Sequence, residues 1–114
     1  MAGFMALVRG GSDMASYSPE EMQSIMASWQ LWMERLGKEG KITGGEPLDD
    51  AASIITGKDK IQSDGPYAET KDAVGGYLLI EARDLAEATK FVEDCPCFET
   101  DCTLEIRPIL QLGE

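Results

Sequence analysis

Two short segments of this chain consist almost entirely of apolar residues. Residues Phe4–Val8 and Tyr77–Ile80 each form a continuous apolar run. Such a run is typical of a β-strand that is covered on both faces. A sheet that contains these strands therefore needs a cover on each side, and the chain of 114 residues is long enough for only one domain.

Two helices are predicted between the strands. Ser18 is the expected N-cap of the first, Glu21 completes a capping box, and Gly37 or Gly40 ends the helix. Asp84 is the expected N-cap of the second helix, whose inner face is formed by Leu85, Ala88, Phe91 and Val92. The apolar residues of the first helix recur at steps of three and four, namely Met22, Ile25, Met26, Trp29, Trp32, Met33 and Leu36. We interpret this stripe as core, although methionine and tryptophan side chains also suit a small-molecule pocket.

The remaining strands complete a recognisable order. The run Tyr77–Ile80 belongs to a strand predicted at 76–82, and further strands are predicted at 41–45 and 103–112, with a hairpin formed by 52–56 and 60–63. Pro108 lacks an N–H group, so the last strand should lie at a sheet edge or contain a bulge. The order is the α+β, ferredoxin-like βαββαβ pattern with a β-hairpin insertion.

Two helices cover only one face of a four-stranded antiparallel sheet. Because the first and third long strands are apolar on both faces, we expect the second face to be buried in a homodimer. The interface should bury well above ~1,000 Å².

Charge and composition restrict the classes of partner. Ten basic and twenty-one acidic residues give a net charge of −11, which argues against binding to nucleic acid or to anionic membranes. The chain has no apolar run of membrane-spanning length, and the first residues lack the features of a signal peptide, so a cytoplasmic location is expected. The absence of histidine removes the usual general base and the usual zinc or haem ligand, and no cofactor is expected.

The three cysteines are Cys95, Cys97 and Cys102. Their spacing fits neither a CxxC motif nor a paired zinc pattern, although a soft-metal or redox site is conceivable. We interpret them as reduced thiols, and expect neither a zinc site nor a required disulfide.

The richest cluster of chemical groups is the segment 63–72, which leads into Ala73–Tyr77. Asp64 precedes Gly65-Pro66, and Pro66 has no N–H for the usual Asx-turn, so the carboxylate is available to another group. Asp64 is the candidate general acid or base, with a structural role in the turn as the alternative. The candidate ligand-binding residues are Arg9, Trp29, Asp64, Tyr67, Glu69, Thr70, Lys71, Tyr77 and Arg107. A buried Arg9 or Arg107 would need a carboxylate, and an anionic ligand or Asp64 would serve.

The run Asp64–Lys71, followed by Gly75–Tyr77, resembles the DGPF-type branch of the YciI-like (YCII-related) family, with Tyr67 where the family name implies Phe. Further matching residues are Trp29, Trp32, Gly45–Leu48, Asp84–Ala88 and Glu105–Pro108. The resemblance implies a dimeric α/β-barrel of ferredoxin-like protomers with a small-molecule cleft near this loop. Some relatives are linked to elimination or dehydrochlorination of small aromatic compounds by a His–Asp pair. Asp64 matches the Asp of that pair, and its His has no counterpart in this chain.

Two functions follow as hypotheses. The first is a non-catalytic or regulatory ligand-binding module, which agrees with the association of DGPF-type proteins with extracytoplasmic-function sigma factors that the resemblance implies. The second is a small-molecule lyase or isomerase that uses Asp64 as general acid or base. Haem-dependent oxidation, which other dimeric α/β-barrels perform, ranks last because the chain has no histidine ligand.

Overall fold

A four-stranded antiparallel sheet forms the centre of the molecule. The computed structural model describes residues 2–10, 17–49, 51–65 and 73–112. The strands are β1 (Ala2–Gly10), β2 (Ile42–Pro47), β5 (Val74–Ala82) and β6 (Cys102–Pro108). Their spatial order is β2-β5-β1-β6, with every pair antiparallel. This order agrees with the predicted ferredoxin-like pattern, and it places the two apolar runs in the central strands.

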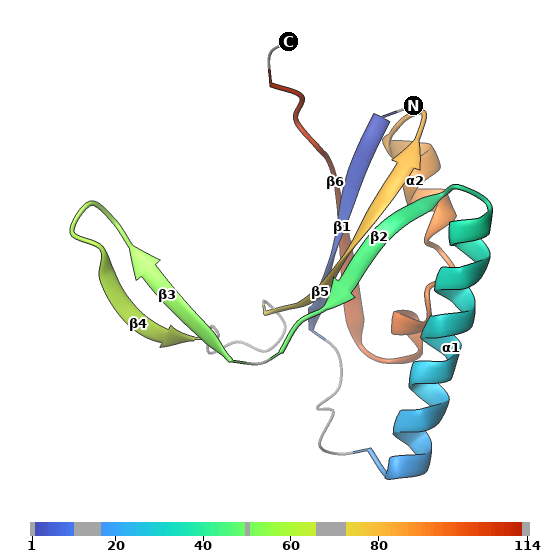
Figure 1. Cartoon of the computed structure of the whole chain (residues 1–114), viewed down its shortest axis with the longest axis horizontal. Helices are drawn as coiled ribbons and strands as arrows, with labels where there is room; N and C mark the ends of the chain where they lie inside the picture. The colour runs from blue at the N-terminus through green and yellow to red at the C-terminus, as the bar shows by residue number, and fades with distance from the viewer. Residues whose placement is uncertain (1, 11–16, 50, 66–72, 113–114) are drawn as a thin grey trace.

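The helices lie on one side of this sheet (Figure 1). Helix α1 (Pro19–Lys38) begins with the predicted capping box, in which Ser18 and Glu21 each accept a hydrogen bond from the other's backbone N–H. Gly40 has a φ of 75°, a left-handed conformation that glycine adopts without strain, and it follows the helix end. Helix α2 (Leu85–Phe91) is capped by Asp84 as predicted, and a 3₁₀ turn, η3 (Pro96–Glu99), leads to β6.

The core occupies the space between the helices and the covered face of the sheet. On β1 and β5 this face consists of every second residue, and the helices add Trp32, Leu36 and Ala88. The strand residues with almost no exposed surface are Phe4, Ala6, Leu78, Ile80 and Ala82. The helical stripe is therefore core at its C-terminal end, as expected, whereas Met26 nearer the N-terminus is largely exposed.

Three predictions about strand bounds and helix faces are corrected by the structure. Strand β6 ends at Pro108, so the sequence prediction of a strand to residue 112 was wrong. Pro108 lies on an edge strand, where its missing N–H costs no ladder hydrogen bond. Leu85 is exposed rather than part of the inner face of α2, because it is the first residue of a short helix. Asp64 belongs to a strand and not to a loop.

The inserted hairpin forms a separate two-stranded sheet of β3 (Ala52–Thr56) and β4 (Ile61–Gly65). We call residues 51–65 the arm. Its turn contains Gly57 and Lys60, both with positive φ. The arm projects away from the main sheet, on the side opposite the helices (Figure 1). The radius of gyration is 15.8 Å, whereas a compact domain of this length has about 13 Å.

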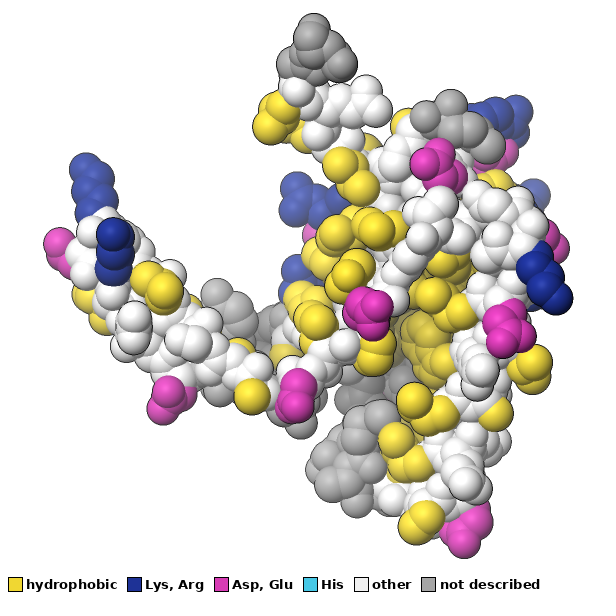
Figure 2. All heavy atoms as spheres, viewed as in Figure 1, with side chains coloured by type: hydrophobic (Ala, Val, Ile, Leu, Met, Phe, Trp, Pro, Cys, Tyr) yellow, Lys and Arg dark blue, Asp and Glu magenta, His cyan; other side chains and the backbone are white. Residues whose placement is uncertain are grey.

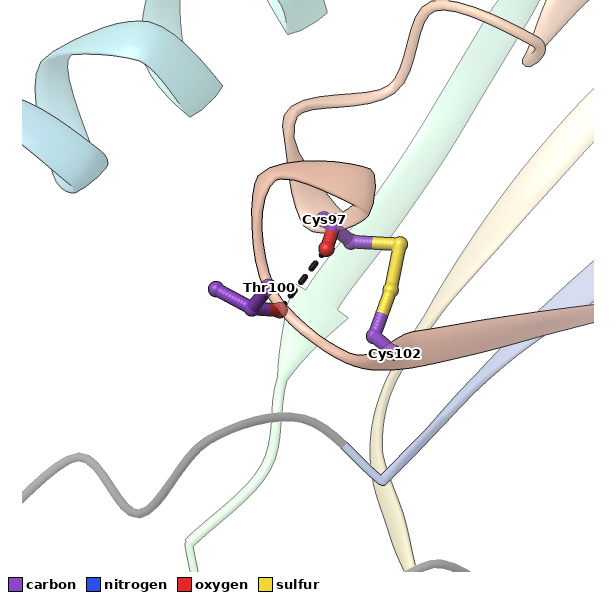
Figure 3. Close-up of a disulfide and its surroundings, with 3 residues drawn as sticks. All are labelled: Cys97, Thr100 and Cys102. Carbon is purple, nitrogen blue, oxygen red and sulfur yellow. Dashed lines mark hydrogen bonds between the residues drawn. A yellow bond between two sulfur atoms is a disulfide. The ribbon is translucent and has the colours of Figure 1, made fainter.

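The cysteines differ from the sequence prediction. Cys97 and Cys102 form a disulfide, whereas reduced thiols were expected. The η3 turn brings their Cα atoms to 5.7 Å, and the hydroxyl of Thr100 donates a 2.7 Å hydrogen bond to the Cys97 carbonyl within the same turn (Figure 3). This turn geometry could not be inferred from the spacing of the cysteines. Cys95 is free and buried, and burial raises the pKa of its thiol to about 11.

Asp94 connects α1 to the turn that follows α2. The indole Nε1 of Trp32 donates to one carboxylate oxygen at 2.9 Å, and Nη2 of Arg35 donates to the other at 2.6 Å. Both hydrogen bonds lower the pKa of Asp94, the one from Trp32 more than the one from Arg35. The contact therefore satisfies the single polar atom of a buried indole.

Candidate functional site

The second face of the sheet has no cover among the described residues. Alternate residues of the central strands point to it, so that Leu7 lies opposite Tyr77 on β5 and opposite Glu105 on β6. The neighbouring pairs join Met5 to Leu79 and Met5 to Arg107. These apolar side chains are only half-buried. We call this surface the open face.

The open face contains an apolar hollow of about 220 Å³. Its lining residues come from β1, from β6 and from the residue after β6, and they are Met5, Leu7, Arg107, Pro108 and Ile109. The backbone N–H of Ile109 donates to the Gly3 carbonyl at 2.9 Å, which holds Ile109 at the rim. Hydrophobic side chains gather over the sheet on the side that faces the arm (Figure 2). The hollow therefore combines apolar walls with one guanidinium group.

Arg9 forms an ion pair on the same face. Its Nε donates to Oε1 of Glu105 at 2.8 Å, and the two side chains are 30% and 42% exposed. Arg9 pairs with Thr103 and Glu105 pairs with Leu7, so the two charged groups are diagonal neighbours. The sequence predicted that Asp64 or an anionic ligand would pair with the guanidinium of Arg9. The structure corrects this prediction, because the carboxylate that pairs with Arg9 comes from Glu105.

The predicted site residues are distributed over three regions. Arg9, Tyr77 and Arg107 lie on the open face, where the strand register brings them together. Trp29 lies on the covered side, where its ring contacts that of Trp32 edge to face at 5.8 Å. Asp64 lies on the arm, exposed and opposite Ser53. Four further residues, Tyr67, Glu69, Thr70 and Lys71, lie outside the described parts of the chain.

Sequence reasoning missed Met5, Leu7, Glu105 and Ile109 as residues of this surface. A signal for the first two was present, because alternation within the run 4–8 divides it into a covered and an open set. Glu105 required the register of β6 against β1, which the sequence does not reveal. Ile109 was expected to lie within a longer last strand, and its place at the rim depends on the end of that strand at Pro108.

Two further findings concern the described residues. Residues 2–10, 17–49, 51–65 and 73–112 contain no group of three or more Cys, Asp or Glu side chains that could hold a metal ion. In the same ranges no helix is both long and apolar enough to cross a bilayer. Among the described residues, the open face presents apolar side chains together with the hydroxyl of Tyr77, the guanidinium groups of Arg9 and Arg107 and the carboxylate of Glu105.

Comparisons with known proteins agree on the family and the fold. The chain matches the family model of the YCII-related domain over residues 4–112. An uncharacterised protein of Rhizobium meliloti (strain 1021) is 30% identical over 100 residues, which cover 83% of this chain and 81% of the relative. The solved structure of 5-chloro-2-hydroxyhydroquinone dehydrochlorinase (TftG) from Burkholderia phenoliruptrix AC1100, in complex with 2,5-dihydroxybenzoquinone, is similar with a TM-score of 0.53 and 19% identity. The structural match covers 97% of this chain and 95% of the TftG chain.

Proposed function

This chain belongs to the YCII-related family, and on that premise we propose that it is a dimeric module that binds a small, planar, anionic molecule on the open face. The observation that carries this proposal is the hollow, in which Met5 and Leu7 provide apolar walls and Arg107 provides a cation. A flat ring fits between apolar side chains, and a guanidinium recognises carboxylate or phenolate oxygens by charge-assisted hydrogen bonds.

The size of the hollow supports a site that is completed by a second wall. Its volume of about 220 Å³ is below the roughly 300–1,000 Å³ of typical small-molecule sites. It is also open to solvent on the side away from the helices. A second copy packed on the open face would close it and would complete the burial of Leu79 and Tyr77, which are half-buried in the single chain. We therefore propose the homodimer and the binding site as parts of one arrangement.

The probe for this proposal is 2,5-dihydroxybenzoquinone, the ligand of the similar TftG structure. This acidic quinone absorbs visible light, so binding can be followed as a spectral change or by calorimetry. We expect saturable binding to the wild-type protein and a loss of at least ~10-fold in affinity for Arg107→Ala, because the substitution removes a charge-assisted hydrogen bond. Lys90→Ala, on α2 at the covered side, is the matched control and should bind normally. Equal binding by both variants would contradict the role of Arg107.

The second candidate is an enzyme that uses Asp64 as general acid or base. The support for it is the similarity of the fold to that of TftG, which is a dehydrochlorinase. A carboxyl group in acid–base catalysis needs an environment that brings its pKa near the working pH, and Asp64 is exposed in the single chain. Chloride release from 5-chloro-2-hydroxyhydroquinone tests this function. Release by the wild type that Asp64→Asn abolishes, with quinone binding retained, would favour the enzyme over the binding module.

A further inference from the structure

The arm forms a sheet that is separate from the main four-stranded sheet. Within the described parts of the chain, strands β3 and β4 pair only with each other, and a two-stranded hairpin alone is marginally stable in water. Its two most exposed large apolar residues are Ile55, which is 61% exposed, and Ile61, which is 65% exposed. They occupy opposite faces of the hairpin, since Ile61 pairs with Thr56 and Ile55 pairs with Gln62. The isoleucines on both faces of the arm therefore lack a covering surface among the described residues of this chain.

The charge of the arm separates it from the rest of the chain. Lys58 and Lys60 balance Asp59 and Asp64, so residues 51–65 have no net charge and the whole charge of −11 belongs to the other residues. Two such acidic bodies repel each other, whereas a neutral arm with lysines at its tip meets an acidic body without that penalty. Figure 2 shows Lys side chains at the tip of the arm, and other Lys and Arg side chains over the rest of the molecule. Charge therefore favours a second copy of this chain as the partner.

The topology argues that the arm serves the partner's hollow and not its own. The arm follows β2, one edge strand, whereas the hollow is lined by β6, the other edge strand, together with β1. A twofold axis that runs along the strands would bring the β2 edge of one copy over the β6 edge of the other. The five-residue strands of the arm span about 17 Å, and a sheet of four strands is about 14 Å wide from edge to edge. The arm is therefore long enough to lie across the sheet of the partner.

We propose that the arm of each copy docks on the open face of a second copy, beside its hollow, so that each small-molecule site contains residues from two chains. Isologous symmetry then forms two equal sites per dimer. The arrangement brings Asp64, which shares one face of the arm with Ile55 and Gln62, to the site of the partner. This inference rests on the proposed dimer and binding site.

The first test measures assembly without any ligand. Sedimentation equilibrium of the double variant Ile55→Gln and Ile61→Gln should show a dissociation constant raised at least ~10-fold, because two apolar contacts are lost while the charge of the arm is unchanged. Leu31→Gln is the matched control, since Leu31 is 69% exposed on α1 and its substitution should leave assembly unchanged. Circular dichroism establishes that the double variant retains the fold. An unchanged dissociation constant for the double variant, or a wild-type monomer at micromolar concentration, would overturn the proposal.

The second test asks which chain supplies the arm. The arm double variant is mixed with Arg107→Ala, whose hollow is defective, above the dissociation constant of the hybrid, and binding of 2,5-dihydroxybenzoquinone is measured. Each variant alone should bind weakly, whereas the hybrid should recover one site per dimer, because the intact arm of one chain reaches the intact hollow of the other. Recovery supports the proposal, and absence of recovery overturns it. If the wild type fails to bind the quinone while the arm variant still dissociates, the proposed ligand fails and the arm contact stands.

Discussion

The two faces of the main sheet are built from the same strands but have different surroundings. On β5, Ile80 is almost completely buried under the helices, whereas its neighbour Leu79 is half-buried on the open face. Both residues come from one apolar run, so composition does not distinguish them. The difference arises because successive side chains of a strand point to opposite faces, and the helices cover only one. An apolar run on a sheet with one cover therefore indicates a surface that a partner should bury.

The largest expected effect separates these two neighbours. Ile80→Ala should lower the free energy of unfolding by about 2–5 kcal/mol, because it leaves a cavity in a packed core. Leu79→Ala should cost less than half of this in dilute protein, and its cost should grow with protein concentration as the dimer forms. Urea denaturation at two protein concentrations measures both effects. Equal costs in dilute protein would show that the open face is already covered within one chain.

Reduction of the disulfide tests the covered side. Breaking the bond between Cys97 and Cys102 opens a loop with a sequence separation of 5, and loop-closure entropy predicts a loss of about 2 kcal/mol. The loss should be independent of protein concentration, because Cys97 belongs to the core cluster and not to the open face. Urea denaturation with and without a reducing agent gives the value. A loss that depends on protein concentration would connect η3 to the dimer interface.

The contact between Asp94 and Trp32 should have a smaller effect on the same side. Asp94→Ala leaves the indole N–H of the buried Trp32 without its partner, and we expect a cost of about 1–2 kcal/mol. This cost is low for a buried polar group that loses its partner, because the Asp94 side chain is 59% exposed and a water molecule can take its place as the acceptor. Thermal denaturation measures the cost. Asp94→Asn, which keeps an acceptor for Trp32, is the control and should be less destabilising.

Acidification tests the same residue. The pKa of Asp94 in the folded state is lowered by Trp32 and Arg35, so the folded state binds its proton less readily than the unfolded state. The stabilising contribution is therefore present above the unfolded pKa of about 4 and is lost as pH falls through the lower folded value. Stability between pH 5 and pH 3 should decrease less in Asp94→Asn than in the wild type. Parallel pH curves for the two proteins would contradict this contribution.

The smallest expected effect concerns the other aspartate, on the arm. Asp64→Asn should change the free energy of unfolding by no more than about 0.5 kcal/mol, because Asp64 is exposed and lies outside the core. If Asp64 instead has the structural role in the turn that the sequence analysis gave as the alternative, the loss in free energy of unfolding is about 1–3 kcal/mol. Thermal melts of the two proteins decide between these values. A large loss would favour the structural role.

Local signals in the sequence determined the regular elements of this protein. Ser18, Glu21 and Asp84 set the starts of the helices, because capping depends on neighbours three residues apart. The apolar runs and the order of elements predicted the ferredoxin-like pattern, and Pro108 lies on an edge strand, which is one of the two positions predicted for it. The inserted hairpin was also predicted, since its turn residues and strands are contiguous.

Only the tertiary structure decided which of these residues act together. The ion pair of Arg9 with Glu105 and the hollow beside Arg107 depend on the register of β1 against β6, two strands at opposite ends of the chain. The separation of Trp29 from Arg107 depends on the face that α1 covers. The disulfide of Cys97 depends on the shape of one 3₁₀ turn. These contacts are set by strand pairing and packing between distant segments, which the spacing of residues along the chain does not specify.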